Sequence, residues 1–242
     1  GLRTSDDGCR TWRDVPSTGV QPGGSSINWL AAYPNNYSIL YAGMDGLGGL
    51  YRSTDSGTTW QPASAGLPPG SHATALTADP RKPEHLLVGL RYDREHHPPA
   101  YVYRSTDGGL TWRSSSTGIT VMPNNGGRIT GLAWAGANLY AATPYDGIFR
   151  STDRGDPWQP AATPQRADVT DGSGASTGTE RPVVINRLRG TDDGVLVIAT
   201  NEGAYQSLDG GLSWTGFGPR ELAGVPVLVG LDPPGSAVGQ GP

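Results

Sequence analysis

Short apolar runs separated by polar turns recur along the chain, and no stretch shows sustained helical periodicity. Each repeat of this pattern begins with two predicted β-strands, which are joined by a turn that contains Asn, Pro, Asp or Gly. Candidates for the first strand are 27–33, 73–78, 129–135 and 183–188, and candidates for the second are 39–43, 86–90, 139–142 and 195–200. Third-strand candidates follow at 49–52, 100–104, 147–150 and 203–206. The pattern therefore predicts an all-β chain.

A nine-residue phrase follows each third strand, with a hydroxyl residue, Asp, Gly and Trp near fixed places. Its copies occupy 52–60, 104–112, 150–158 and 206–214, and a fifth copy at 3–12 carries one extra residue. The shared residues are Asp6, Asp55, Asp107, Asp153 and Asp209, with Trp12, Trp60, Trp112, Trp158 and Trp214. The aspartates are 49, 52, 46 and 56 positions apart, which is the period of a propeller blade or a solenoid turn.

Each phrase fits a β-hairpin that is built around its aspartate. A turn Asp accepts backbone N–H bonds, and the Gly after it takes positive φ. The Trp then starts the return strand, where its large ring can cover the seam with a neighbouring unit. We expect these aspartates and tryptophans to be structural, and four antiparallel strands per unit make a propeller blade.

The phrase Ser-x-Asp-x-Gly-x-Thr-Trp resembles the Asp-box, or BNR repeat, and 107–112 matches it closely. The resemblance implies a β-propeller with the box in the hairpin between the third and fourth strands of each blade. Proteins of this kind include sialidases, xyloglucanases, sortilin-type receptors and photosystem II assembly factors. The resemblance is thus specific for the fold and leaves the function open.

The two ends of the chain predict how the ring closes. Residue 1 falls inside a third strand, while a further first strand at 227–232 and a weak second strand near 236–240 follow Trp214. Residues 1–15 would complete that last blade, which removes the open sheet edge of a linear array. We therefore predict five blades in one domain over 1–242, with a larger ring broken by truncation as the alternative. A Gly-, Ser- and Thr-rich segment at 162–182 is predicted to be a flexible insertion or a mobile cover.

Composition narrows the classes of partner. The net charge is −4, and the basic residues, Lys82 and seventeen arginines, form no dense cluster, so nucleic acid is not an expected partner. No run of about 18 apolar residues predicts a membrane span, and the chain shows no signal peptide. Cys9 is the one cysteine, which rules out an internal disulfide. We expect a monomer, and the resemblance suggests an extracytoplasmic or secreted location.

The loops between second and third strands share a chemical feature, because each carries an acid: Asp45, Asp93, Asp146 and Glu202. Such loops lie on the face opposite the boxes and could form an acidic ring that binds a cation, a basic segment or sugar hydroxyls. The alternative is that each acid is a solvated turn residue. Neighbouring aromatic and basic residues complete the candidate binding set: Tyr92, Arg94, His96 and Tyr145.

No metal or cofactor is expected. His96 and His97 are adjacent, so their rings tend to point to opposite sides of an extended backbone, which disfavours chelation of one metal.

Two enzyme hypotheses follow from the resemblance. Sialidases carry an Arg-Ile-Pro element, but here Thr130 follows Arg128-Ile129, which argues against that activity. The segment 41–52 is similar to the part of xyloglucanases that carries a catalytic Asp, at or next to Asp45. Those enzymes use a second carboxylate from a second propeller, since hydrolysis needs both an acid and a base. We therefore predict a non-catalytic binding or assembly module that recognises a protein segment or a glycan. The alternative is a xyloglucanase-like glycoside hydrolase, or a propeller fragment of one.

Overall fold

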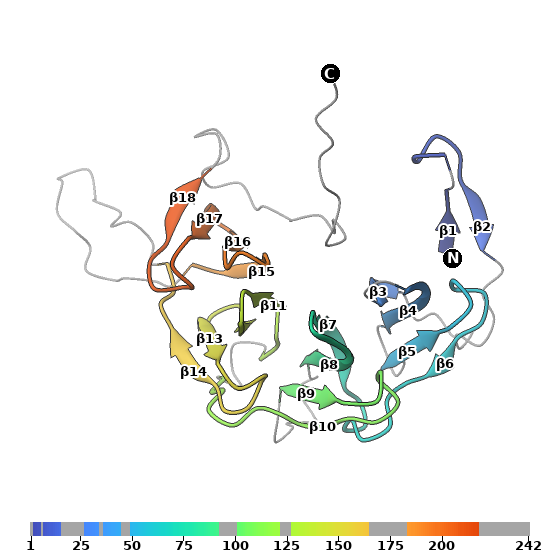
Figure 1. Cartoon of the computed structure of the whole chain (residues 1–242), viewed down its shortest axis with the longest axis horizontal. Helices are drawn as coiled ribbons and strands as arrows, with labels where there is room; N and C mark the ends of the chain where they lie inside the picture. The colour runs from blue at the N-terminus through green and yellow to red at the C-terminus, as the bar shows by residue number, and fades with distance from the viewer. Residues whose placement is uncertain are drawn as a thin grey trace.

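Strands form all the regular structure in the part of the chain that the computed structural model describes, which is residues 2–5, 7–15, 27–33, 36–44, 49–91, 101–121, 127–164 and 183–217. Figure 1 shows five sheets that follow one another around an arc in chain order. Four of them have four strands and one has two, and the five sheets fit five propeller blades. The prediction of an all-β propeller is confirmed.

The first sheet along the chain is a hairpin of β1 (Leu2–Thr4) and β2 (Arg13–Val15). Blade 1 contains β3 (Ile27–Tyr33), β4 (Asn36–Met44), β5 (Leu50–Ser53) and β6 (Gln61–Pro62). Blade 2 contains β7 (His72–Asp79), β8 (Lys82–Arg91), β9 (Val102–Ser105) and β10 (Arg113–Ser114).

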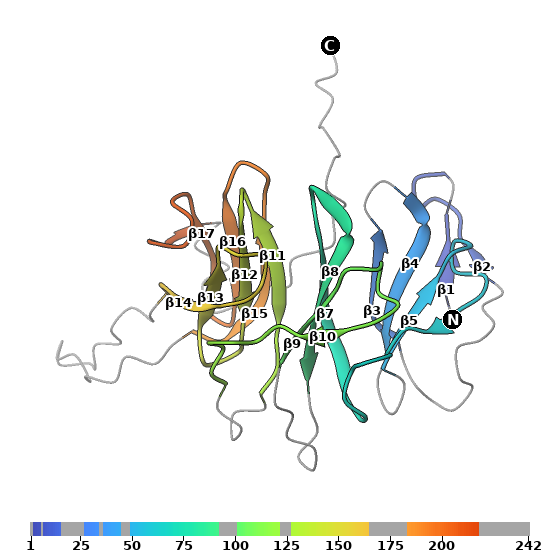
Figure 2. The same ribbon diagram turned by 60° about the horizontal axis from the view of Figure 1, so that its bottom comes forward.

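Blade 3 contains β11 (Gly131–Ala135), β12 (Asn138–Ala142), β13 (Ile148–Ser151) and β14 (Gln159–Ala161). Blade 4 contains β15 (Ile185–Gly190), β16 (Leu196–Thr200), β17 (Gly203–Ser207) and β18 (Thr215–Phe217). In each blade the strands pair antiparallel in chain order, and the first strand lies on the inner side of the arc (Figure 1). Figure 2 shows the blades standing side by side.

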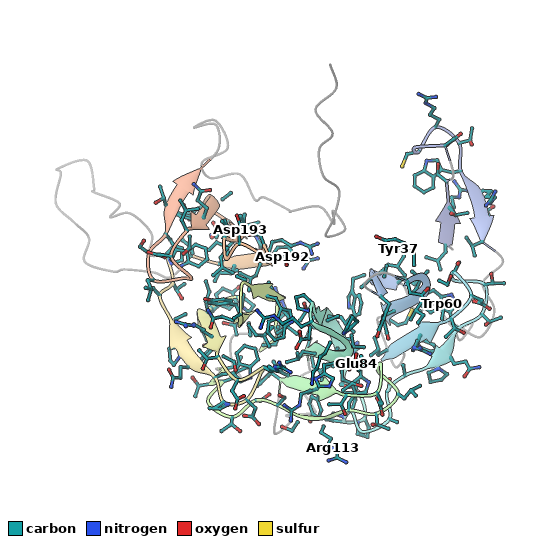
Figure 3. All side chains as sticks on the ribbon, in the orientation of Figure 1. Tyr37, Trp60, Glu84, Arg113, Asp192 and Asp193 are labelled. Atoms are coloured by element: carbon teal, nitrogen blue, oxygen red, sulfur yellow. The ribbon has the colours of Figure 1, made fainter. Side chains whose placement is uncertain are left out.

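The hydrophobic core lies mainly at the seams between blades. Tyr41 and Leu50 of blade 1 cluster with Leu86 and Trp112 of blade 2, and similar clusters join blade 2 to blade 3 and blade 3 to blade 4. The second strands are the most buried, since each has a run of three to five almost wholly buried residues at or next to its end. In Figure 3, Trp60 lies among the side chains of blade 1, whereas Arg113 points outward from β10.

The box hairpins join the third strand to the fourth in every blade. In blade 1, Asp55 Oδ1 accepts bonds from the Ser53 hydroxyl at 2.8 Å and the Thr59 N–H at 2.8 Å, and Oδ2 accepts one from the Thr59 hydroxyl at 2.6 Å. The Ser53 hydroxyl oxygen in turn accepts the Gly57 N–H at 2.9 Å. The same bonds recur around Asp107 and Asp209.

The first unit requires a correction of one residue. Asp7, and not Asp6, holds the box position, because its carboxylate accepts bonds from Ser5, from the Thr11 N–H and from the Thr11 hydroxyl. This copy therefore has no extra residue, and Cys9 stands where the other boxes have Gly. Asp6 itself lies outside the described residues.

Box tryptophans tie each blade to the one before it. The indole N–H groups of Trp112, Trp158 and Trp214 donate to the carbonyls of Ala63, Ser115 and Ala162, each at 2.8 Å and each on the preceding blade. The predicted strands at 227–232 and 236–240, and most of the predicted insertion at 162–182, lie outside the described residues. No helix in the described part of the chain is long and apolar enough to cross a membrane.

Candidate functional site

The loops between second and third strands all leave their blades in the same way. A backbone N–H at the end of the second strand donates to a carbonyl at the start of the third: Met44 to Gly49 at 3.0 Å, Leu90 to Tyr101 at 2.9 Å, and Thr143 to Gly147 at 3.0 Å. In blade 4, Thr200 pairs with Gly203 in the ladder itself. Because antiparallel strands alternate in direction, these loops share the side of the ring opposite the boxes. We call this side the loop face.

A buried threonine shapes the loop in blades 3 and 4. The hydroxyl of Thr143 accepts the Asp146 N–H at 3.0 Å and donates to the Gly147 carbonyl at 3.0 Å. The hydroxyl of Thr200 accepts the Glu202 N–H at 3.1 Å and donates to the Gly203 carbonyl at 2.8 Å. Both threonines are fully buried, so the backbone at each acid is fixed by the blade. Two carboxylates are thus presented from neighbouring blades on equivalent loops.

Each of these acids lies near a tyrosine. Burial, and next the negative charge of Asp146, raise the pKa of Tyr101, which stands at the start of the third strand of blade 2. Burial, and next the charge of Glu202, raise the pKa of Tyr205 on β17. Tyr145 lies beside Asp146 with 43% of its surface exposed. Tyr101 and Tyr205 also pack against the core clusters, so the exposed tyrosine of the described loop face is Tyr145.

The structure describes three of the eight predicted binding residues. Tyr145, Asp146 and Glu202 are on the loop face, whereas Asp45, Tyr92, Asp93, Arg94 and His96 lie outside the described residues. Tyr101 and Tyr205 were missed by the sequence reasoning. Tyr101 directly precedes β9 and Tyr205 is the third residue of β17, so a search for aromatic residues within three positions after an acid-bearing loop finds them.

The side chains of the loop face have the chemistry to meet a hydroxyl-rich ligand. Carboxylates accept hydrogen bonds from sugar hydroxyls, and tyrosine rings provide apolar faces with a polar tip. Among the described residues, no group of three or more His, Cys, Asp or Glu side chains could hold a metal ion.

No family model matches the chain. In sequence it is similar to two bacterial xyloglucanases, Xgh74A of Acetivibrio thermocellus and an enzyme of a Paenibacillus species. The first is 33% identical over 132 residues, which cover 47% of this chain and 16% of the enzyme. The second is 26% identical over 245 aligned residues, which cover 88% of this chain and 23% of the enzyme. The chain thus spans less than a quarter of the length of either enzyme.

Two solved structures show the same fold. The GH74 xyloglucanase of Xanthomonas campestris is 19% identical with a TM-score of 0.54, over 77% of this chain and 29% of the other. YCF48 of Cyanidioschyzon merolae is 18% identical with a TM-score of 0.56, over 86% of this chain and 60% of the other. At these identities the likeness concerns the fold, and it agrees with a propeller.

Proposed function

We propose that this chain is a non-catalytic glycan-binding propeller whose loop face holds a neutral polysaccharide of the xyloglucan type. The observation that carries the proposal is the placement of Asp146 and Glu202 on equivalent loops of adjacent blades, where a buried threonine hydroxyl accepts the N–H of each acid, with the exposed Tyr145 beside Asp146. A sugar ring offers hydroxyls at its edge and apolar C–H groups on its faces, which match a carboxylate beside an aromatic ring.

Sequence similarity favours a glycan over a protein segment as the ligand. Both bacterial relatives bear the name xyloglucanase, and the longer alignment runs through 88% of this chain. An extracytoplasmic location is part of the same proposal, because a polysaccharide ligand of this size is met outside the cytoplasm.

A second candidate function is hydrolysis, and the same similarity to xyloglucanases favours it. Asp45 would be one catalytic carboxylate, as expected from the segment 41–52. A glycosidase needs a second carboxyl group as acid, base or nucleophile. Within this chain Asp93, Asp146 or Glu202 would have to supply it.

The test is calorimetric titration with xyloglucan oligosaccharides, with release of reducing ends measured in the same samples. We expect saturable binding without product, and about tenfold weaker binding in Asp146→Asn and in Glu202→Gln, since a hydrogen bond to a charged group contributes about 1.5–3 kcal/mol. Asp192→Asn is the matched control, because Asp192 is an exposed acid in the turn between β15 and β16, which lies at the opposite end of β16 from the loop that carries Glu202.

Three results would change the conclusion. Product release that Asp45→Asn abolishes would make the chain a hydrolase. Binding that is equally strong in the loop-face variants and the control would place the ligand elsewhere. Absence of binding to any glycan would leave a protein segment as the ligand class.

A further inference from the structure

A pocket of about 420 Å³ lies between blade 2 and blade 3, on the side that carries the boxes. Its lining includes Asp79, Leu87 and Arg104 from blade 2, and Trp134, Arg154 and Asp156 from blade 3. The volume is within the range of small-molecule sites, about 300–1,000 Å³. This pocket is separate from the loop face, which lies at the other ends of the strands.

The pocket exists because one seam lacks a tyrosine that its neighbours have. Tyr41 donates its hydroxyl proton to the Gly108 carbonyl of the next blade at 2.8 Å, and Tyr140 does the same to Gly210 at 2.7 Å. Both tyrosine side chains are fully buried and close their seams. By strand register the equivalent residue of blade 2 is Leu87, which follows Leu86 as Tyr41 follows Leu40. Leucine is shorter and has no hydroxyl, so this seam stays open.

The residues around the opening depart from the repeat. Trp134 pairs with Leu139 of the second strand. In the other blades the residue equivalent to Trp134 is small: Ala32, Ala78 and Gly190. Asp156 stands at the position that Thr58, Leu110 and Leu212 occupy in the boxes of blades 1, 2 and 4. The next position is Pro157, which has neither the N–H nor the hydroxyl that Thr59 gives to Asp55. The box of blade 3 therefore lacks the hydrogen-bond donors that Thr59 provides in blade 1, and it carries an additional carboxylate, that of Asp156.

Three polar atoms of the lining have no hydrogen-bond partner among the described residues: Asp79 Oδ2, Asp156 Oδ1 and Trp134 Nε1. Asp79 is only 2% exposed, and its other oxygen accepts the Arg81 N–H at 2.8 Å. The partly exposed Arg154 approaches Asp79 Oδ2 at 3.8 Å, which is too long for a hydrogen bond. Leaving a buried polar group unsatisfied costs about 1–3 kcal/mol, so a ligand or water that meets these atoms is favoured.

The indole N–H of Trp134 differs from those of five other tryptophans, because it has no hydrogen-bond partner among the described residues. Five other indole N–H groups donate to backbone carbonyls: those of Trp29, Trp60, Trp112, Trp158 and Trp214. Trp134 packs its ring on the cluster that contains Leu87 and Phe149. This pocket-lining residue therefore has its ring fixed by the core, while its buried N–H has no hydrogen-bond partner among the described residues.

We infer that this pocket binds one unit of a neutral saccharide. A hydroxyl group donates and accepts at once, so adjacent hydroxyls can satisfy both carboxylate oxygens and the indole N–H. A guanidinium or ammonium group would satisfy the carboxylates but leave the indole N–H unpaired and face Arg104 and Arg154. An anion would meet the carboxylates of Asp79, Asp153 and Asp156. The neutral polyol is the chemistry that fits all three atoms.

The test uses ¹H–¹⁵N NMR of the tryptophan indole groups, with glucose, xylose and cellobiose as probes. Trp134→Phe identifies the Trp134 signal by its loss. We expect a saturable shift of that signal with at least one sugar. The shift should persist in the loop-face variant Asp146→Asn/Glu202→Gln, which separates this site from the proposed function.

Leu87→Tyr is the decisive variant, because it should fill the pocket as Tyr41 and Tyr140 fill theirs. The new hydroxyl is placed to reach the Arg154 carbonyl, which corresponds to Gly108 and Gly210. We expect a folded protein with at least tenfold weaker sugar binding at this site. Asp156→Asn should also weaken binding while leaving the pocket open. Tyr140→Leu is the matched control, since it opens the next seam without the polar lining and should bind no additional sugar.

The inference would be overturned by a folded protein in which no sugar gives a saturable shift of the Trp134 signal. It would also be overturned if Leu87→Tyr left sugar binding unchanged. A saturable shift with guanidinium or inorganic phosphate, and none with the sugars, would assign the pocket to a charged ligand instead.

Discussion

Cys9 shows how a single residue can depart from the repeat at a structural cost. It has a φ of 68° in the place where the other boxes have glycine, with φ of 89° at Gly57 and 82° at Gly109. A side chain in this left-handed conformation costs roughly 1–2 kcal/mol relative to the right-handed one. The hairpin still closes, because the Cys9 N–H donates to the Ser5 hydroxyl at 2.9 Å as Gly57 does to Ser53.

Cys9→Gly should therefore stabilise the first hairpin. Removing the side chain relieves the strain, while the greater freedom of glycine in the unfolded chain offsets about 0.4–1 kcal/mol, which leaves a net gain of about 0.5–1 kcal/mol. The measurement is amide hydrogen exchange at Thr11, whose N–H donates a hydrogen bond to the Asp7 carboxylate within this hairpin. Exchange should slow by about threefold.

Gly57→Ala is the reverse change at the equivalent position. An added Cβ there would meet Leu40 at 3.4 Å, an ordinary contact, so the positive φ alone decides the effect. This variant should lower the stability of blade 1. Faster exchange at Thr11 in Cys9→Gly would contradict the assignment of Cys9 to the glycine position.

At the scale of elements, the box hairpin acts as an acid-sensitive unit. Hydrogen bonds from the Thr59 hydroxyl, the Thr59 N–H and the Ser53 hydroxyl lower the pKa of Asp55 from 3.8 to about 2. At Asp107 burial raises the pKa, but the bonds from Ser105 and Thr111 outweigh it, and the pKa again falls to about 2. Because the folded-state pKa lies below the unfolded value, ionised aspartate favours the folded state.

The double variant Asp55→Asn/Asp107→Asn should be less stable than the original chain at pH 5. The contribution of the two carboxylates is complete above pH 3.8 and is lost as the pH falls to about 2. The difference in unfolding free energy between the variant and the original chain should therefore become smaller as the pH falls from 3.8 towards 2. Urea unfolding midpoints of both proteins at pH 5, 4, 3 and 2.5 measure this change. A difference that stays constant down to pH 2.5 would show that these hydrogen bonds do not depend on ionisation.

The strands were predictable because their signals are local. The apolar run 27–33 coincides with β3, and the second strands differ from prediction mainly by extending outward into their turns, as β8 does from 86–90 to Lys82–Arg91. Box alignment in the first unit failed because two aspartates stand side by side and Gly8 follows Asp6 at the usual spacing of the box glycine. Asp7 has the usual spacing to Trp12, and its hydrogen bonds identify it as the box residue.

The sites were less predictable, because they depend on contacts between blades. The acids at 146 and 202 are visible as loop residues, and Tyr205 stands three positions after Glu202, but the nearness of Tyr101 to Asp146 becomes apparent only once blades 2 and 3 are placed side by side. The pocket at the second seam results from a missing tyrosine, Leu87, and a lone substitution in a buried strand has no local signature. Aligning the repeats by register would reveal it as a difference from Tyr41 and Tyr140.

For the whole molecule, the seams between blades determine whether the ring behaves as one unit. Every blade forms its own ladder, but the clusters that bury its second strand are shared with a neighbour. Arrays of such units owe their cooperativity to these nearest-neighbour interfaces. The box tryptophan is the largest side chain that crosses a seam, and its indole N–H bonds the preceding blade at three of them.

Trp112→Ala should therefore weaken the whole ring, whereas Trp12→Ala should not. Trp112 is 3% exposed and bonds Ala63 across the first seam, so its removal should cost about 3–5 kcal/mol. Trp12 occupies the same place in the first box but is 56% exposed, and its loss should cost less than about 1 kcal/mol.

Urea unfolding followed by far-UV circular dichroism measures the loss of unfolding free energy in both variants, and this signal does not depend on tryptophan emission. The slope of the transition should also fall in Trp112→Ala if blade 1 begins to unfold apart from the others. Equal losses in the two variants would mean that the box tryptophan stabilises its own hairpin and that the blades are joined by other contacts.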